Sequence, residues 1–313
     1  MRVSAALWVG LVASLPHIAR ADPPAAPMQE ATVRGRASPR EPWRRDLDAA
    51  DLQRMAGTRG DALLAVQNLP GVGRPPFGLG AFVLRGSDPE DSLVTLESQP
   101  IGLPFHLYGL ATTLATDLID RVEVLPGNFS ARWGRAAGGV VNVVLRAPRR
   151  DRVRLVADVD VIDAGVFASV PLGRRAAVAL GARRSYLDGL AALFTPAAQR
   201  QSFVRLPRYW DWQVALDADV SSRDAVRVVG SGSDDALVLN FAEPDPNDPS
   251  LYGEAGSITR FHGVQGRWLH RFGPSVSHTL APALGWSHAL VSAGSAVRYD
   301  ITTTTFALRD EVD

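Results

Sequence analysis

The sequence predicts a small α+β domain followed by an antiparallel β-sheet of about eight strands. Up to about residue 146, short helical and strand patterns alternate along the chain, whereas beyond it apolar and polar residues alternate with period two. The 313 residues include 28 Gly and 22 Pro, more than a helical bundle would carry. The chain has no Cys, which excludes disulfides and thiolate metal sites, and its formal net charge of zero gives no electrostatic case for nucleic acid.

The first 21 residues have the three parts of a secretory signal peptide. Arg2 supplies a positive start, residues 5–15 form an apolar core, and residues 19–21 (Ala-Arg-Ala) have the small-x-small form of a cleavage site. We therefore expect residues 1–21 to be removed and the mature chain to begin at Asp22. A short membrane anchor or a buried helix is the alternative, although the apolar core is shorter than the roughly 20 residues that span a bilayer.

Residues 22–46 are rich in Pro, Ala and Arg, which predicts an extended periplasmic linker. Within it, residues 30–34 (Glu-Ala-Thr-Val-Arg) form a short patch that favours β-structure. Thr32 and Val33 could add a strand to the sheet of a partner protein through backbone hydrogen bonds. A plain linker, or a first strand of the following domain, is the alternative.

Residues 47–146 predict the α+β domain, which is large enough to fold by itself. Short helices are expected at 51–55 and 61–69, each with an Asp placed as its N-cap, and the Pro-Gly pair at 70–71 ends the second. Further short elements are expected as strands at 81–86, 92–96, 121–125 and 140–145, and as a helix at 111–119.

Four segments of this domain follow one another in a specific order and spacing. They are 69–72 (Leu-Pro-Gly-Val), 83–86 (Val-Leu-Arg-Gly), 119–127 (Ile-Asp-Arg-Val-Glu-Val-Leu-Pro-Gly) and 133–144 (Trp-Gly-Arg-Ala-Ala-Gly-Gly-Val-Val-Asn-Val-Val). Each is common by itself, but together they resemble the plug domain of TonB-dependent outer-membrane receptors. The resemblance implies an α+β plug domain followed by an antiparallel transmembrane β-barrel.

The resemblance also assigns plug-motif positions. They are Arg85, Gly86, Glu123, Gly127, Gly134, Gly138, Gly139 and Asn142. The glycines would permit positive φ and close backbone approach, although ordinary turns use glycine too. Arg85 and Glu123 are candidate partners of a buried ion pair. Where the family has Asp-Gly after the strand at 92–96, this chain has Glu97 and Ser98, so that turn lacks its most permissive residue.

Beyond residue 146, eight stretches have the alternation of half-buried strands. In the stretch 210–220, Trp210, Trp212 and Val214 share one face, whereas Asp211 and Gln213 share the other. The other seven stretches are 152–161, 166–170, 176–184, 225–231, 259–271, 276–287 and 297–308.

The connections between these strands differ in length. Those at 173–174, 221–224 and 272–274 are short, whereas those at 185–208 and 234–257 are long and polar. Short turns at one end and long loops at the other are typical of an outer-membrane barrel, with tryptophans in girdles at the two lipid interfaces. The candidate girdle residues are Trp210, Trp212, Trp268 and Trp286. A soluble β-sandwich is the alternative for the alternation alone.

The 167 residues 147–313 are too few for a closed barrel around a plug. Eight closed strands leave room only for side chains, whereas plugged transporters have about 22 strands. We therefore expect residues 147–313 to be the first part of a larger barrel, an incomplete sheet with an aggregation-prone edge at 297–308.

By its resemblance, such a receptor binds a scarce siderophore-, cobalamin- or glycan-like solute and imports it with energy from a TonB-type periplasmic protein. Its other partner is outer-membrane lipid, and no cofactor is implied. Gln99, His106 and Tyr108 are candidate solute contacts. The alternative is that these three side chains merely pack under the barrel.

No enzyme is expected. The histidines lack the spacing of a metal motif, and no Gly-x-Ser-x-Gly nucleophile elbow occurs. Residues 230–235 are expected to end a strand and begin a loop, and the acidic loop 243–254 lacks the ordered spacing of a calcium site. Other functions to weigh are a structural or adhesion barrel without import, a non-functional fragment, and a hydrolase barrel, which would need a facing Ser and His pair.

Overall fold

The computed structural model describes residues 43–75, 80–194, 203–241, 253–294 and 297–313. These segments lie within one compact unit of the chain. The signal segment 1–21, the proposed strand-adding residues Thr32 and Val33, and most of the acidic loop 243–254 fall outside the described residues.

The first sheet has five strands in the order β1-β8-β9-β4-β5. Its strands are β1 (Arg45–Asp48), β4 (Ser92–Leu96), β5 (Gln99–Pro100), β8 (Ile119–Leu125) and β9 (Gly139–Leu145). Strands β4 and β9 are parallel, and every other neighbouring pair is antiparallel. The β-branched run of β9 is buried along most of its length, as expected for the centre of a sheet covered on both faces.

Two small hairpins and short helical segments complete this domain. The hairpins pair β2 (Val72–Gly73) with β3 (Val83–Leu84), and β6 (Phe105–His106) with β7 (Ala111–Thr112). The helical segments are α1 (Ala49–Arg54), α2 (Ala62–Val66), and the 3₁₀ turns η2 (Pro89–Asp91) and η3 (Thr116–Leu118).

The N-cap expected for the second helix is confirmed. One carboxylate oxygen of Asp61 accepts hydrogen bonds from the backbone N–H groups of Leu63 and Leu64, at 3.0 and 2.9 Å. For the first helix, the expectation that Asp51 is the cap is wrong, because Asp48 holds the N-cap position and its side chain makes no capping bond.

The helix expected at 111–119 is also wrong. This segment instead contains β7 and η3. The hydroxyl groups of Thr112 and Thr113 donate to the backbone carbonyls of Pro104 and Leu103, at 3.2 and 2.7 Å. β-branched threonines with such partners hold the backbone in an extended form, and this local bonding competes with a helix.

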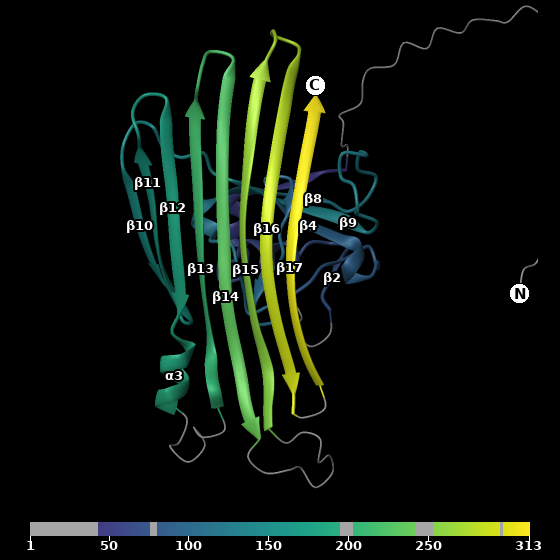
Figure 1. Ribbon diagram of the computed structural model, residues 1–313, viewed down its shortest axis with the longest axis vertical. Helices are drawn as coiled ribbons and strands as arrows, with labels where there is room; N and C mark the ends of the chain where they lie inside the picture. Colours follow the sequence, from purple (N-terminus) through teal and green to yellow (C-terminus); the bar gives the residue numbers. More distant parts are fainter. Residues whose placement is uncertain (1–42, 76–79, 195–202, 242–252, 295–296) are drawn as a thin grey trace, which may run out of the picture. The chain divides into compact units, whose positions relative to one another are not determined.

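The second sheet confirms the eight strands that the alternation predicts, and Figure 1 shows them side by side in chain order. Every neighbouring pair is antiparallel. The strands are β10 (Arg154–Val159), β11 (Asp163–Pro171), β12 (Ala176–Ser185), β13 (Phe203–Asp219), β14 (Asp224–Phe241), β15 (Gly253–Arg271), β16 (Ser277–Ala293) and β17 (Val297–Val312).

Several strands run further than expected. Residues 230–235 lie in the middle of β14, so the expectation that they end a strand is wrong. The connection between β12 and β13 contains helix α3 (Leu187–Phe194). Across the described residues, no helix combines the length and the apolar character needed to cross a bilayer.

The cross-strand register assigns each side chain of the sheet to one of two faces. We call the inner face the one that contacts the first domain: Gln213 and Gln265 belong to it and donate to the carbonyls of Thr113 and Leu96. The outer face carries rows of apolar residues, such as Val214, Gly230, Val264, Leu284 and Phe306. An exposed apolar face of this kind suits contact with lipid.

The four candidate girdle tryptophans lie on this outer face in two bands. Trp212, His262 and Trp286 occupy one cross-strand row and stack, with Trp210 beside them. Trp268 lies on β15 six residues beyond His262, which corresponds to about 20 Å along a strand. This spacing is close to the apolar band of about 25 Å that aromatic girdles flank in outer-membrane barrels.

The sheet is open, with β10 and β17 as its two edges. Strand β17 covers the stretch 297–308 that we expected to be an edge, and it exposes large apolar side chains on both faces, among them Tyr299, Ile301, Phe306 and Leu308. An unpaired strand of this kind offers free N–H and C=O groups for pairing with another chain.

Candidate functional site

Two clusters of buried charged side chains connect the first domain to the inner face of the sheet. The His106 cluster consists of His106 from β6 with Arg183, Tyr209, Asp211 and Asp235 from the sheet. The Arg227 cluster consists of Arg227 and Asp217 from the sheet with Glu97 from the turn after β4. Both clusters join residues that are far apart in sequence.

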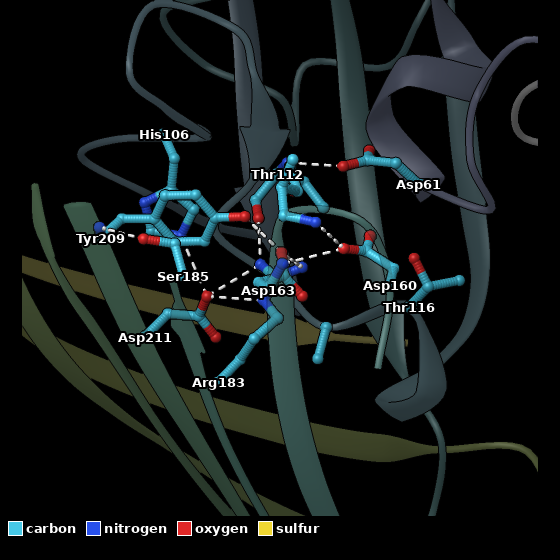
Figure 2. Close-up of polar contacts among 12 residues, drawn as sticks. Asp61, His106, Thr112, Thr116, Asp160, Asp163, Arg183, Ser185, Tyr209 and Asp211 are labelled. Carbon is cyan, nitrogen blue, oxygen red and sulfur yellow. Dashed lines mark hydrogen bonds and ion pairs between the residues drawn. The ribbon is translucent and has the colours of Figure 1, made fainter. Parts of the chain in front are cut away.

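His106 is completely buried between two carboxylates. Figure 2 shows its ring close to Tyr209 and Asp211. Its Nε2 lies 2.9 Å from an oxygen of Asp211, and its Nδ1 lies 2.6 Å from an oxygen of Asp235. A carboxylate accepts hydrogen bonds, so this geometry is satisfied when both ring nitrogens carry a proton and the imidazole is charged. The ring also stacks on Tyr209, with ring centroids 4.1 Å apart.

Arg183 shares Asp211 with His106. Its Nε donates to the same Asp211 oxygen at 2.9 Å, and its guanidinium also donates to the backbone carbonyl of Thr112. The hydroxyl of Tyr209 donates to Asp163, which lies 3.8 Å from the guanidinium of Arg183. Two cations are therefore enclosed by the three carboxylates of Asp163, Asp211 and Asp235, and each buried charge has a partner, as its desolvation requires.

Backbone groups of the first domain join the same cluster. The N–H of Leu107 donates to the second oxygen of Asp235 at 2.9 Å. Gln213 donates to the carbonyl of Thr113 at 2.8 Å and accepts from the N–H of Ala115 at 3.3 Å. The segment from His106 to Ala115 is thus held to β13 and β14 by polar contacts.

The pKa of His106 is raised above its ordinary value of about 6.5. Burial opposes the charged ring and is the largest single effect, but the hydrogen bonds and charges of Asp211 and Asp235 together outweigh it. The surrounding carboxylates therefore favour the charged form of the ring.

This pKa gives a pH dependence whose sign follows from linkage. A group whose pKa is raised on folding contributes fully to the free energy of unfolding when the pH is below its unfolded-state pKa, about 6.5. This contribution to stability is lost as the pH rises through the folded-state pKa. We expect the thermal unfolding midpoint of the protein to fall with rising pH in this window. The measurement compares wild type with His106→Gln by circular dichroism. A wild-type profile parallel to that of the variant would contradict the assignment.

The Arg227 cluster has the opposite arrangement, with the cation on the sheet. The guanidinium of Arg227 lies 3.1 Å from Glu97 and 3.2 Å from Asp217, and it donates to the carbonyl of Leu145 at 2.9 Å. All three charged side chains are close to nine-tenths buried. The cluster therefore fixes the turn after β4, and the end of β9, to the sheet.

The turn after β4 forms although it has Glu97 and Ser98 in place of the Asp-Gly pair of the family. Glu97 and Ser98 both have positive φ, at 51° and 70°, the pattern of a two-residue hairpin turn. The side chain of Glu97 accepts from the N–H of Leu145 at 2.8 Å, and the N–H of Ser98 donates to the side chain of Asn142 at 2.8 Å. These bonds, and the ion pair with Arg227, offset the strain of two left-handed residues without Gly.

The three candidate solute contacts have different surroundings. Gln99 is buried and donates to the backbone carbonyl of Ala281 at 3.0 Å, and His106 is the centre of the buried cluster. The alternative, packing against the sheet, therefore describes what these two side chains do. Tyr108 is 52% exposed and follows Leu107, which bonds to Asp235. Solute contact by any of the three stays a prediction.

The ion pair expected between Arg85 and Glu123 is wrong. Glu123 is buried and accepts from Arg121 at 2.9 Å and from the Nδ2 of Asn142 at 2.9 Å. Arg85 is exposed, and its guanidinium instead lies over Gly127, where an added Cβ would come within 2.9 Å of it. Since Gly127 also has a φ of 149°, only glycine is free of strain there.

Close approach also explains one of the paired glycines. A Cβ at Gly138 would collide with the side chain of Ser87. Its backbone N–H, like that of the residue before it, donates to the carbonyl of Asp91, so the chain passes directly over η2. For Gly134, nothing in the described residues lies within contact distance of an added Cβ.

Sequence reasoning did not find the sheet residues of the two clusters. The alternation placed Asp211 and Gln213 on the polar face of their strand, and the structure confirms that this face is turned toward the first domain. No sequence motif includes Arg183, Asp235 or Arg227. The only signal was a charged residue at an inner-face position of a long strand, which is costly to bury unless it is paired.

Comparison with known proteins agrees with this architecture. Residues 44–141 match the family model of the TonB-dependent receptor plug domain. A mutant of the ferric enterobactin receptor PfeA from Pseudomonas aeruginosa is similar in structure, with a TM-score of 0.59 and 13% identity over 86% of this chain and 46% of that one. Among curated proteins, none matches.

Two further solved structures are similar. The siderophore receptor PirA from Acinetobacter baumannii has a TM-score of 0.58 and 16% identity over 84% of this chain and 43% of that one. The open form of the ferric-catecholate import receptor Fiu from E. coli K12 has a TM-score of 0.55 and 14% identity over 86% of this chain and 44% of that one. The chain thus spans less than half the length of these relatives. Residues 44–141 thus form a TonB-dependent receptor plug domain, and the fold of the described residues is that of such a plug followed by eight strands of a barrel wall.

Proposed function

We propose that the chain serves the TonB-dependent uptake of an iron complex across an outer membrane. The solved structures that resemble it are named as ferric enterobactin, siderophore and ferric-catecholate receptors, which supports this solute class. In this role the receptor binds and passes its solute without changing it, and the domains are a signal peptide (1–21), a linker (22–46), a plug (47–146) and part of a barrel (147–313).

One observation carries the proposal: the plug is held to the wall by buried charges as well as by apolar packing. Water that enters between plug and wall can hydrate the charged groups of the His106 and Arg227 clusters one at a time, which offsets the loss of their ion pairs. A wholly apolar interface has no such compensation, because its separation exposes apolar area to water. Such contacts suit a plug that must leave the wall and return. A structural barrel without import has no need for a releasable plug.

The direction of uptake follows from the connections of the sheet. The short turns between β11 and β12, β13 and β14, and β15 and β16 belong on the periplasmic side, so the opposite ends of these strands, which the long sequence stretches 186–202 and 242–252 separate, belong on the outside. Tyr108 is then a proposed solute contact on the outward side of the plug, and Thr32 and Val33 are the proposed TonB contact on the periplasmic side.

Val33→Pro is expected to abolish energised uptake and leave solute binding intact, because proline removes a backbone donor from the added strand. The measurement is the uptake of radioactive iron complexes by cells that produce the receptor, with surface binding measured in parallel. Val33→Thr, which keeps the donor and the β-propensity, is the matched control and should transport normally. Normal uptake by Val33→Pro would place the coupling contact elsewhere.

A further inference from the structure

The inner face of the barrel wall is divided into a charged part and an uncharged part. The charged part lies on β11 to β14 and holds the two clusters that bind the plug. On β15 to β17, by contrast, a continuous block of inner-face positions carries no charge. We call this block the neutral wall, and it consists of Ala255, Ser257, Thr259, Phe261, Gly263, Gln265, Ala281, Ala283, Gly285, Ser287, Ala289, Val291, Ala293, Val297, Tyr299, Ile301, Thr303, Thr305 and Ala307.

The outward half of the neutral wall exposes large apolar side chains. The row of Asp235, which binds His106, continues through Thr259 and Ala289 to Ile301. Beyond this row, toward the long connections, lie Val291 and Tyr299. Ile301 and Tyr299 are 55% and 60% exposed, and Val291 is exposed as well.

The charged residues of the same stretches point the other way. Glu254, Arg260, Arg298 and Asp300 alternate with the neutral wall and therefore lie on the outer face. Across the lipid-facing band the pattern is reversed, since Val264, Leu284 and Phe306 point outward there. Along these strands, the apolar residues thus change from the outer face to the inner face at about the level of the Trp212 and Trp286 band.

A cavity continues the neutral wall alongside the plug. It has a volume of about 180 Å³ and lies between residues 99–102 of the plug and strands β14 to β17. Its inner-face lining includes Phe261, Ala283, Ser287 and Thr305, all uncharged, whereas Arg135 lines it from the plug side. The first inner-face charge further along β17 is Arg309, which donates to the carbonyl of Arg132 in the plug.

We propose that the solute has an uncharged and largely apolar body, and that it binds against the neutral wall and moves along it. This inference rests on the proposed function as an importer. An apolar surface inside the mouth of a water-filled barrel is costly unless something covers it. An anionic complex would lose its hydration against this wall and find no cation on it, which disfavours its binding there.

The chain has no native cysteine, so a single introduced thiol reports on one position of the wall. Ser287→Cys and Val291→Cys place the thiol on the neutral wall, and Ser292→Cys places it on the outer face next to Val291. Each variant is labelled with N-ethylmaleimide in cells that lack TonB, so that binding is measured without transport. The two competing probes are ferrichrome, an uncharged ferric hydroxamate, and ferric enterobactin, an anionic ferric catecholate.

We expect ferrichrome to slow the labelling of Ser287→Cys and Val291→Cys by about tenfold, the effect of a ligand present at about nine times its Kd. Ferric enterobactin should leave both rates unchanged, and Ser292→Cys should be labelled equally with either probe. Protection by ferric enterobactin alone, or by neither probe, overturns the inference. Protection by ferrichrome together with normal uptake in Val33→Pro would keep the inference and refute the proposed coupling contact.

Discussion

His106→Leu is expected to destabilise the docking of the plug on the wall by about 3–5 kcal/mol. The variant removes the cation that lies between Asp211 and Asp235, so that Arg183 is left to compensate both of these buried carboxylates. Asp235 then keeps only the N–H of Leu107 as a plug partner. The measurement is thermal unfolding in detergent, together with the rate at which a protease cleaves the plug.

A second histidine gives a matched control for this substitution. His288 on the outer face lies 2.9 Å from Asp300, but it has no buried partner of its own and Asp300 is half exposed. His288→Leu should therefore cost no more than about 1 kcal/mol, the range of exposed pairs. Equal effects of the two substitutions would show that the His106 cluster contributes no more than a surface ion pair.

Glu97→Gly is expected to destabilise the protein, whereas Ser98→Gly is expected to be neutral or stabilising. Both relieve a left-handed residue in the same turn. The gain of roughly 1–2 kcal/mol, less an entropic cost of roughly 0.5–1 kcal/mol for a new glycine, leaves about 1 kcal/mol. Only Glu97→Gly also removes the carboxylate that pairs with Arg227 and accepts from Leu145, at an expected net cost of about 2–3 kcal/mol. Ser98→Gly keeps those bonds and should be neutral or stabilising.

Denaturant unfolding of the two variants and of Arg227→Met tests this comparison. If the ion pair explains why a strained glutamate occupies the turn, Glu97→Gly should have little further effect once Arg227 has been replaced. Additive losses in the double variant would mean that Glu97 stabilises the turn through Leu145 alone.

The sequence predicts the sheet better than it predicts the plug. In the barrel wall, a period-two pattern has a direct physical cause, because successive side chains of a strand point to opposite faces and one of these faces meets the plug, so Trp210 and Asp211 alone already assign the two faces. In the plug, the segment 111–119 has apolar residues at helical spacing, yet Thr112 and Thr113 bond to the backbone carbonyls that precede β6 and exclude the helix. The local sequence pattern does not reveal side-chain hydrogen bonds that compete with helix formation.

The candidate site could be predicted only in its parts. The sequence marks His106 as a candidate solute contact, but its partners Asp211 and Asp235 lie more than 100 residues further along the chain. Nothing in one sequence says which inner-face carboxylate meets which plug residue. The turn at Glu97 shows the same limit: the missing glycine was evident, whereas the compensating contact with Arg227 depends on how the two domains dock.

The shared carboxylate of Asp211 has a consequence for the wall when the plug is displaced. Asp211 keeps Arg183 as its partner, because both belong to the sheet, whereas Asp235 loses both His106 and the N–H of Leu107. Without the plug, the wall therefore keeps the carboxylates of Asp163, Asp211 and Asp235 but only the guanidinium of Arg183. The site then has a net negative charge that one further cation would reduce. The negative charge of this site attracts the charged imidazole of His106, so it directs the returning plug to the same position on the wall.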